Sequence, residues 1–181
     1  LRRLFLAAAE KGSHLAFHVD EIGDPTVNTL AVISETALDF GFPGRILAGH
    51  CCSLSIIDDE DRRRTIDLVA RAGIAVVSLP MCNMYLQGRG GGTPRWRGTT
   101  VFKELAAAGV PVGMASDNTR DPFFAYGDLD LAEVWREGTR ILHHDHPCEA
   151  WDRSVVRTPP AILAPADHGP PSPASPARFP V

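Results

Sequence analysis

Four short apolar runs alternate along the chain with longer stretches in which apolar residues recur at helical spacing. The runs have the length of strands and are dense in aliphatic residues. The predicted strands are residues 15–19, 45–49, 74–79 and 110–116. The predicted helices are residues 2–11, 24–40, 55–72, 101–108, 128–143 and 147–156. A strand followed by a helix, repeated four times, is typical of an α/β fold with a parallel sheet and crossover helices.

Local signals place the element boundaries. Asp24 as N-cap and Pro25 in the first turn predict the start of the second helix. Pro80 is interpreted as the end of the third strand, so residues 81–98, with five glycines, are predicted to be a long loop. Its glycine-rich part, residues 88–92, is not within a short strand-to-helix turn, so we interpret it as a mobile lid or a loop that allows close approach rather than a phosphate cradle.

The C-terminal part of the chain differs from the rest. Eight prolines lie within residues 157–181, so we predict a disordered tail there and a folded domain at residues 1–156. The chain does not begin with Met, and we expect it to start inside a longer gene. The proline-rich end is interpreted as a frameshifted or truncated continuation of the fold.

Composition limits the class of protein. The chain has 181 residues, 44% hydrophobic and 22% charged, with a net charge of −4, which is ordinary for a globular domain. It has neither a basic block nor an apolar run near the ~18 residues that span a bilayer, so neither nucleic acid nor a membrane is expected as a partner.

The four cysteines lack a C-x-x-C spacing, which argues against a zinc ribbon or a thioredoxin-like motif. Cys51 and Cys52 could form a strained vicinal disulfide, but two reduced thiols are the favoured interpretation. This cysteine usage predicts a cytoplasmic location.

Three of the four predicted strands end in residues that bind metals or move protons. His18, Asp20 and Glu21 follow the first strand, His50 follows the second, and Asp117 follows the fourth. Parallel strands place their carboxyl ends at one mouth, so these side chains are expected to meet there. Imidazole and carboxylate groups together predict a metal or acid–base site, although a single strand-end histidine is more often structural.

Residues 15 to about 146 resemble the C-terminal half of the barrel of cytosine deaminase and its relatives in the metal-dependent amidohydrolase superfamily. The resemblance implies a partial TIM-type (β/α)₈ barrel that binds one divalent metal ion, iron or zinc, at its mouth. The stretches that carry it are His18-Val19-Asp20-Glu21, Gly49-His50, Asn83-Met84-Tyr85-Leu86-Gln87-Gly88-Arg89 and Ser116-Asp117-Asn118-Thr119-Arg120-Asp121-Pro122-Phe123.

The resemblance also implies roles for single residues. His18 and Asp117 would be metal ligands, and Glu21 would carry the proton. His50 and Asp117 would orient and deprotonate the attacking water. The implied reaction is hydrolytic deamination of a cytosine-like ring, a C–N bond cleavage on a small nucleobase-like substrate.

The pocket residues implied by the resemblance are Asn83, Gln87, Asn118 and Phe123. Asn118 stands where a bacterial cytosine deaminase has a second Asp, and Phe123 replaces a Trp, so the heterocycle stays open. The His-x-His pair of the family's first strand is absent, and residues 143–146 cannot replace it, because they are interpreted as a polar helix end. We therefore expect feeble or no turnover by the 181-residue chain alone.

Two other functions stay open at this point. The same scaffold could open a cyclic amide, or the chain could be a non-catalytic half-barrel that self-associates through exposed sheet edges.

Overall fold

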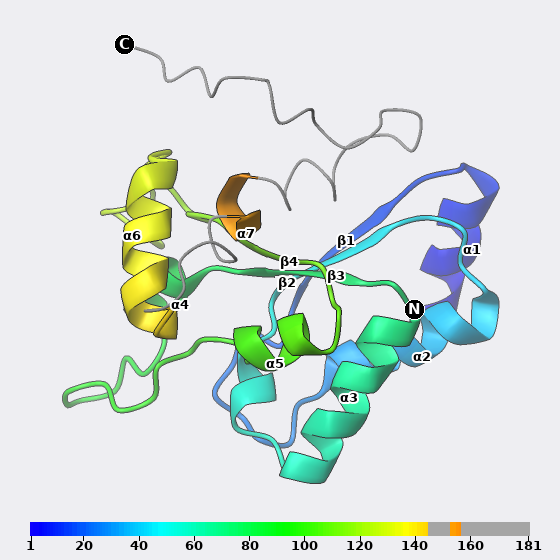
Figure 1. The fold of residues 1–181 in the computed structure, drawn as a ribbon, viewed down its shortest axis with the longest axis horizontal. Helices are drawn as coiled ribbons and strands as arrows, with labels where there is room; N and C mark the ends of the chain where they lie inside the picture. The colour runs from blue at the N-terminus through cyan, green and yellow to red at the C-terminus, as the bar shows by residue number, and fades with distance from the viewer. Residues whose placement is uncertain (145–152, 157–181) are drawn as a thin grey trace.

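The chain folds as a parallel α/β unit in the computed structural model, which describes residues 1–144 and 153–156 (Figure 1). The described strands form one sheet in the order β1-β2-β3-β4, with every neighbouring pair parallel. The strands are β1 (Leu15–Val19), β2 (Ile46–His50), β3 (Ala75–Ser78) and β4 (Val112–Met114). The predicted α/β fold class with a parallel sheet is thereby confirmed.

The register brings the carboxyl ends of the four strands to the same end of the sheet. Val19 pairs with His50 at the ends of β1 and β2, and Ser78 pairs with Met114 at the ends of β3 and β4. The residues that follow these four positions therefore enter loops on the same side of the sheet.

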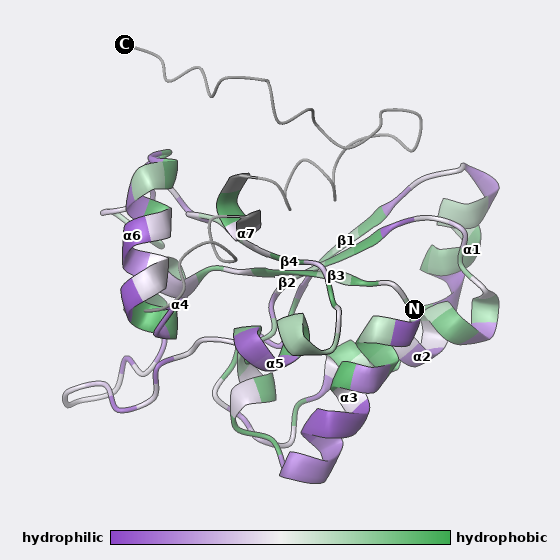
Figure 2. Ribbon diagram, in the orientation of Figure 1, coloured by the Kyte–Doolittle hydropathy of each residue, from purple (hydrophilic) through white to green (hydrophobic). Residues whose placement is uncertain are grey.

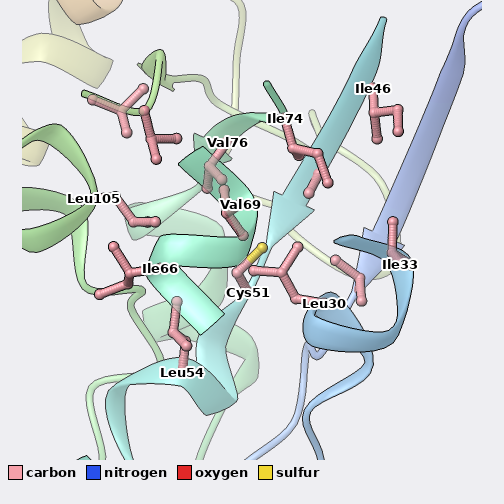
Figure 3. Close-up of a cluster of buried hydrophobic side chains, with 14 of the residues drawn as sticks. Leu30, Ile33, Ile46, Cys51, Leu54, Ile66, Val69, Ile74, Val76 and Leu105 are labelled. Atoms are coloured by element: carbon pink, nitrogen blue, oxygen red, sulfur yellow. The ribbon is translucent and has the colours of Figure 1, made fainter. Parts of the chain in front are cut away.

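One face of the sheet packs against helices and forms the core (Figure 3). Figure 2 shows the strands mainly hydrophobic and the outer part of α3 hydrophilic. Buried core residues include Leu30 on α2, Val69 on α3, Leu105 on α5 and Val76 on β3. The helices concerned are α1 (Arg2–Glu10), α2 (Thr29–Phe40), α3 (Asp59–Arg71) and α5 (Phe102–Ala107).

The other face of the sheet is lined by apolar side chains from all four strands. A cavity of about 360 Å³ lies against Ala16, Leu47, Val77 and Met114, with Val155 of the short helix α7 (Arg153–Val156) on its far side. Parallel sheets normally bury both faces, so this surface is the one that a complete barrel would enclose.

The sheet has two open edges, because neither β1 nor β4 has a second partner strand in the described part of the chain. Self-association through these edges stays a prediction, as does the cytoplasmic location. Among residues 1–144 and 153–156, no helix has the length and apolarity needed to cross a membrane.

The predicted loop at residues 81–98 is wrong in its first part. Residues Pro80–Leu86 form helix α4, in which Pro80 occupies the first turn instead of ending the strand. The backbone N–H of Asn83 donates to the carbonyl of Leu79, and that of Gln87 donates to Asn83. A proline after a strand is compatible both with the end of the strand and with the start of a helix, and the sequence pattern did not distinguish the two.

The second predicted helix begins four residues later than expected, counted from N-cap to N-cap. Asn28 is its N-cap, accepting from the N–H of Ala31, whereas Asp24 accepts from the N–H of Thr26 and so closes a separate turn. The predicted helix 55–72 likewise starts at Asp59, after a 3₁₀ turn at Cys52–Ser55. Asp and Asn are both common N-cap residues, so residue type alone did not distinguish a start of α2 at Asp24 from one at Asn28.

The last predicted helices are found in part. Helix α6 (Leu131–Leu142) begins after Asp130, whose carboxylate accepts from the N–H of Ala132. Of the helix predicted at residues 147–156, only α7 is described, and the predicted tail at residues 157–181 lies outside the described residues. Cys51, Cys52 and Cys82 are free thiols, as the sequence favoured.

Candidate functional site

The exits of β1, β2 and β4 bring three side chains into one cluster. Glu21, His50 and Asp117 each offer a ligand atom, and these atoms all lie within 4.8 Å of one another. His50 Nδ1 is 3.3 Å from Glu21 Oε1 and 4.0 Å from Asp117 Oδ2. The structure therefore brings these three side chains together at one mouth, as strand direction predicted.

The backbone at these exits adopts a conformation that L-residues rarely take. The φ angle is 54° at Asp20, 71° at His50, 50° at Cys51 and 68° at Asp117. Such left-handed residues each cost on the order of 1–3 kcal/mol and gather where function demands a particular side-chain direction. At His50 the turn directs a side chain that is only 1% exposed towards the cluster.

His18 lies beside this cluster rather than within it. Its Nδ1 is 2.9 Å from His50 Nε2, and its side chain is exposed on the cavity side of β1. The two imidazole rings are 4.9 Å apart between centroids. His18 Nε2 makes no hydrogen bond to any residue that the structure describes, so it can serve as a ligand atom.

Asp20, placed between these groups in sequence, has a structural role. Its buried carboxylate accepts from the N–H groups of Thr29 and Leu30, both at 2.9 Å. It thereby fixes the start of α2 relative to the exit of β1. This holds the loop that carries Glu21.

Two predicted pocket residues sit on α4 or at its end and contact Glu21. The Asn83 Nδ2 lies 3.1 Å from Glu21 Oε1 and 3.0 Å from His50 Nδ1. Gln87 Nε2 donates to the backbone carbonyl of Glu21 at 3.3 Å. The α4 helix that the sequence analysis missed is thus the element that places both amides.

The other two predicted pocket residues lie in the loop after Asp117. Asn118 donates to Asp121 Oδ2 at 2.7 Å and accepts from the thiol of Cys82 at 3.5 Å. Phe123 is 62% exposed, and its backbone N–H donates to Asp121 Oδ1. The structure does not bring either side chain into the Glu21–His50–Asp117 cluster, and their substrate role stays a prediction.

Burial controls the protonation of the groups around the cluster. Burial lowers the pKa of His50 below its ordinary value and outweighs the opposing carboxylates of Glu21 and Asp117. Burial, with a hydrogen bond to Asp117 and its charge, raises the pKa of Cys82 to about 12. Cys82 next to Asp117 was not foreseen from the sequence, and it is a neutral thiol near neutral pH.

The donor set fits a divalent metal ion. Asp117 Oδ2 is buried and has no hydrogen-bond partner among residues 1–144 and 153–156, which leaves a carboxylate oxygen unsatisfied in the cluster. Imidazole and carboxylate donors are those that zinc and ferrous iron accept. A cation beside Asp117 would supply the missing partner.

Several known proteins are similar to this chain in sequence or in fold. A sequence profile of the Amidohydrolase family matches residues 1–157. The chain belongs to that family. The matched stretch contains every residue of the cluster, so the four-stranded unit is a partial barrel of the amidohydrolase type.

Similar proteins are deaminases and related hydrolases. The chain is 56% identical over 170 residues to a pterin deaminase of Rhizobium rhizogenes, covering 93% of this chain and 39% of that protein. A 5-methylcytosine deaminase of Klebsiella pneumoniae, bound to 5-fluorocytosine, superposes with a TM-score of 0.72 and 31% identity over 77% of this chain and 34% of that one.

A third structure, an N-isopropylammelide isopropylaminohydrolase of Burkholderia multivorans, has a TM-score of 0.65 at 22% identity, covering 84% of this chain and 35% of that one. At this identity the likeness shows a similar fold and nothing about function. The chain spans about two fifths of the length of the pterin deaminase.

Proposed function

We propose that this chain supplies part of the active site of a metal-dependent deaminase acting on a nitrogen heterocycle, a pterin or a cytosine-like ring. The observation that carries the proposal is the cluster of Glu21, His50 and Asp117, with its unpartnered carboxylate oxygen, at the strand exits of an amidohydrolase barrel. The relatives named pterin deaminase and 5-methylcytosine deaminase support the choice of reaction.

His18 and Asp117 are the proposed holders of one iron or zinc ion. His18 offers Nε2, and Asp117 offers the buried Oδ2. A divalent ion held there would act as a Lewis acid that makes a water molecule more acidic near neutral pH. The ligand atoms of His50 and Glu21 lie within 4.8 Å of that of Asp117, so either residue could also bind the ion.

Glu21 is the proposed proton carrier. Its side chain is 33% exposed while its Oε1 lies 3.3 Å from His50 Nδ1, so it borders both solvent and the cluster. In the proposed reaction, water adds to the carbon that bears the amino group, and the carboxylate takes the proton of the water. The same carboxylate passes that proton to the ring nitrogen. It then takes the second proton of the water from the new C–OH group and gives it to the departing nitrogen, which leaves as ammonia as the C–N bond breaks and the carbonyl forms.

His50 and Asp117 are proposed to orient the water and accept its hydrogen bonds. The deprotonation that the resemblance implied for them is assigned instead to Glu21, which borders both solvent and the cluster. Because burial lowers the pKa of His50, its imidazole is neutral near pH 7 and can accept as well as donate. Asn83, which bridges Glu21 and His50, keeps these two groups in mutual reach.

A pterin is the preferred substrate class. Identity to the pterin deaminase is 56%, against 31% to the 5-methylcytosine deaminase. Both kinds of ring carry an amino group on a carbon next to a ring nitrogen, so the same residues could serve either. Phe123 and Asn118 are proposed to contact the part of the ring that differs between them.

A graft tests the proposal and the substrate together. The 170 matched residues of the Rhizobium pterin deaminase are replaced by the corresponding stretch of this chain, and ammonia release is measured with pterin, cytosine and 5-methylcytosine. We expect release from pterin to exceed release from the pyrimidines. A folded, metal-loaded graft that deaminates none of them would contradict the proposal.

The 181-residue chain by itself serves as the comparison. With zinc or iron added, we expect it to release ammonia far more slowly than the graft, because its described strand exits offer only the ligands of β1, β2 and β4. A rate equal to that of the graft would overturn this expectation.

A further inference from the structure

The loop that carries Glu21 is covered by a glycine-rich segment from elsewhere in the chain. Residues 88–98, here called the strap, leave the end of α4 and return to α5. Gly88 and Gly98 bound the strap, with φ angles of 68° and 65° that favour glycine. The strap thus begins and ends at turns that other residues adopt with strain.

Trp96 is the point at which the strap meets this loop. A Cβ built on Gly23 would lie 2.8 Å from both Cε3 and Cζ3 of the Trp96 ring, closer than real side chains approach. The indole therefore packs directly on the backbone two residues after Glu21. The Trp96 Nε1 is buried and has no hydrogen-bond partner within the described residues, so ring packing alone holds the contact.

The base of the strap is closely packed on the same loop. Gln87, whose amide donates to the carbonyl of Glu21, is itself fixed by Gly98, where a Cβ would lie 2.4 Å from Gln87 Cγ. Asn83 holds the Glu21 carboxylate from the same side. Three side chains from residues 83–96 thus contact the loop of residues 21–23.

We propose that Trp96 is a positioning residue for Glu21: by packing on Gly23 it keeps the Glu21 carboxylate against Asn83 and His50. This inference rests on the proposed function, in which Glu21 moves the proton. Glu21 is otherwise exposed on a loop, and a displacement of about 1 Å at a reacting group can cost on the order of a hundredfold in rate.

The contact itself is tested in the 181-residue chain, without any activity. With Trp135 and Trp151 changed to Phe, Trp96 is the sole tryptophan, and its fluorescence quenching by acrylamide reports its exposure. Gly23→Ala drives a methyl into the ring and should raise the quenching constant about twofold or more. Gly90→Ala is the matched control in the strap, because its Cβ would meet nothing within 4 Å. Equal quenching in Gly23→Ala and Gly90→Ala overturns the inference.

The effect on Glu21 is tested in the graft described above. Trp96→Ala should lower kcat for pterin about tenfold to a hundredfold, with KM and bound metal unchanged. Trp96→Phe, which keeps a ring and loses no hydrogen bond, should recover most of the rate. In a Glu21→Gln background, Trp96→Ala should cause no further loss, since both changes then act on the same step.

The outcomes separate the inference from the proposed function. A loss caused by Trp96→Ala that is equally large in the Glu21→Gln background overturns the inference, because Trp96 would then act independently of Glu21. If the graft with Trp96 intact is inactive although folded and metal-loaded, the proposed function fails. The quenching experiment then still decides whether Trp96 holds the Glu21 loop.

Discussion

His50 Nε2 lies 2.9 Å from His18 Nδ1, so one of these two ring nitrogens donates a hydrogen bond to the other. If His18 donates from Nδ1, its Nε2 keeps a lone pair for a metal ion. His50 then carries its own proton on Nδ1 and donates it to Glu21 Oε1 at 3.3 Å, the same oxygen that accepts from Asn83 Nδ2 at 3.1 Å, so Asn83 and His50 are two donors to one acceptor. Metal binding at His18 and a hydrogen bond from His50 to Glu21 are therefore linked through one pair of tautomers.

This linkage gives the first prediction. With one equivalent of zinc bound to the chain, His18 should be protonated on Nδ1 and His50 on Nδ1. Long-range ¹H–¹⁵N correlation spectra of the two rings distinguish the tautomers. A zinc-loaded chain in which His18 keeps its proton on Nε2 would rule out His18 as a ligand through that atom.

Asp117 gives the second prediction. Asp117→Asn replaces a carboxylate whose Oδ2 is buried with no hydrogen-bond partner in the described part of the chain, and it should lower zinc affinity on the order of a hundredfold. Competition with a chromophoric chelator measures the change. Asp128→Asn is the control, because Asp128 lies before α6 and accepts a local N–H from Asp130. Equal zinc affinities of the two variants would show that Asp117 is not a ligand.

Asp20 gives a prediction about stability. Its carboxylate accepts two N–H groups at the start of α2, so Asp20→Asn should lower the free energy of unfolding by about 1–3 kcal/mol. Asn tolerates the left-handed backbone at this position, so the loss reports the hydrogen bonds rather than strain. Urea unfolding measures it, with Asp39→Asn at an exposed position of α2 as the control. An unchanged midpoint in Asp20→Asn would contradict the capping role.

His50 gives a pH dependence for the metal-free chain. Burial lowers its pKa in the folded state below 6.5, so the unfolded chain binds protons more readily at this residue. The contribution of His50 to stability is therefore complete above that pH and is lost as the pH falls below it. Urea unfolding with chelator present, at about pH 7.5 and 5.5, measures the loss. His50→Gln should show a smaller loss, and an equal loss in both proteins would assign the effect to other groups.

The sequence predicted the parts of the fold that depend on periodicity and chain order. The strands ending near Val19, His50 and Met114 were found because short aliphatic runs alternate with helical patterns. Once the sheet was taken as parallel, the meeting of Glu21, His50 and Asp117 followed from strand direction alone.

The remainder depended on tertiary contacts that no local pattern encodes. Pro80 can end a strand or begin a helix, and packing of α4 beside α6 accompanies the second outcome. The contact of Trp96 with Gly23 joins positions far apart in the sequence, and the Trp96 segment was interpreted only as part of a loop. The His18–His50 hydrogen bond likewise depends on side-chain direction at a left-handed residue.

The most direct test of the account is ammonia release from pterin by the graft with and without Glu21→Gln. Because Glu21 is assigned the proton transfers, the substitution should lower kcat on the order of a hundredfold or more while the bound metal is retained. A Glu21→Gln graft that holds its metal and deaminates pterin at the unsubstituted rate would contradict the assignment.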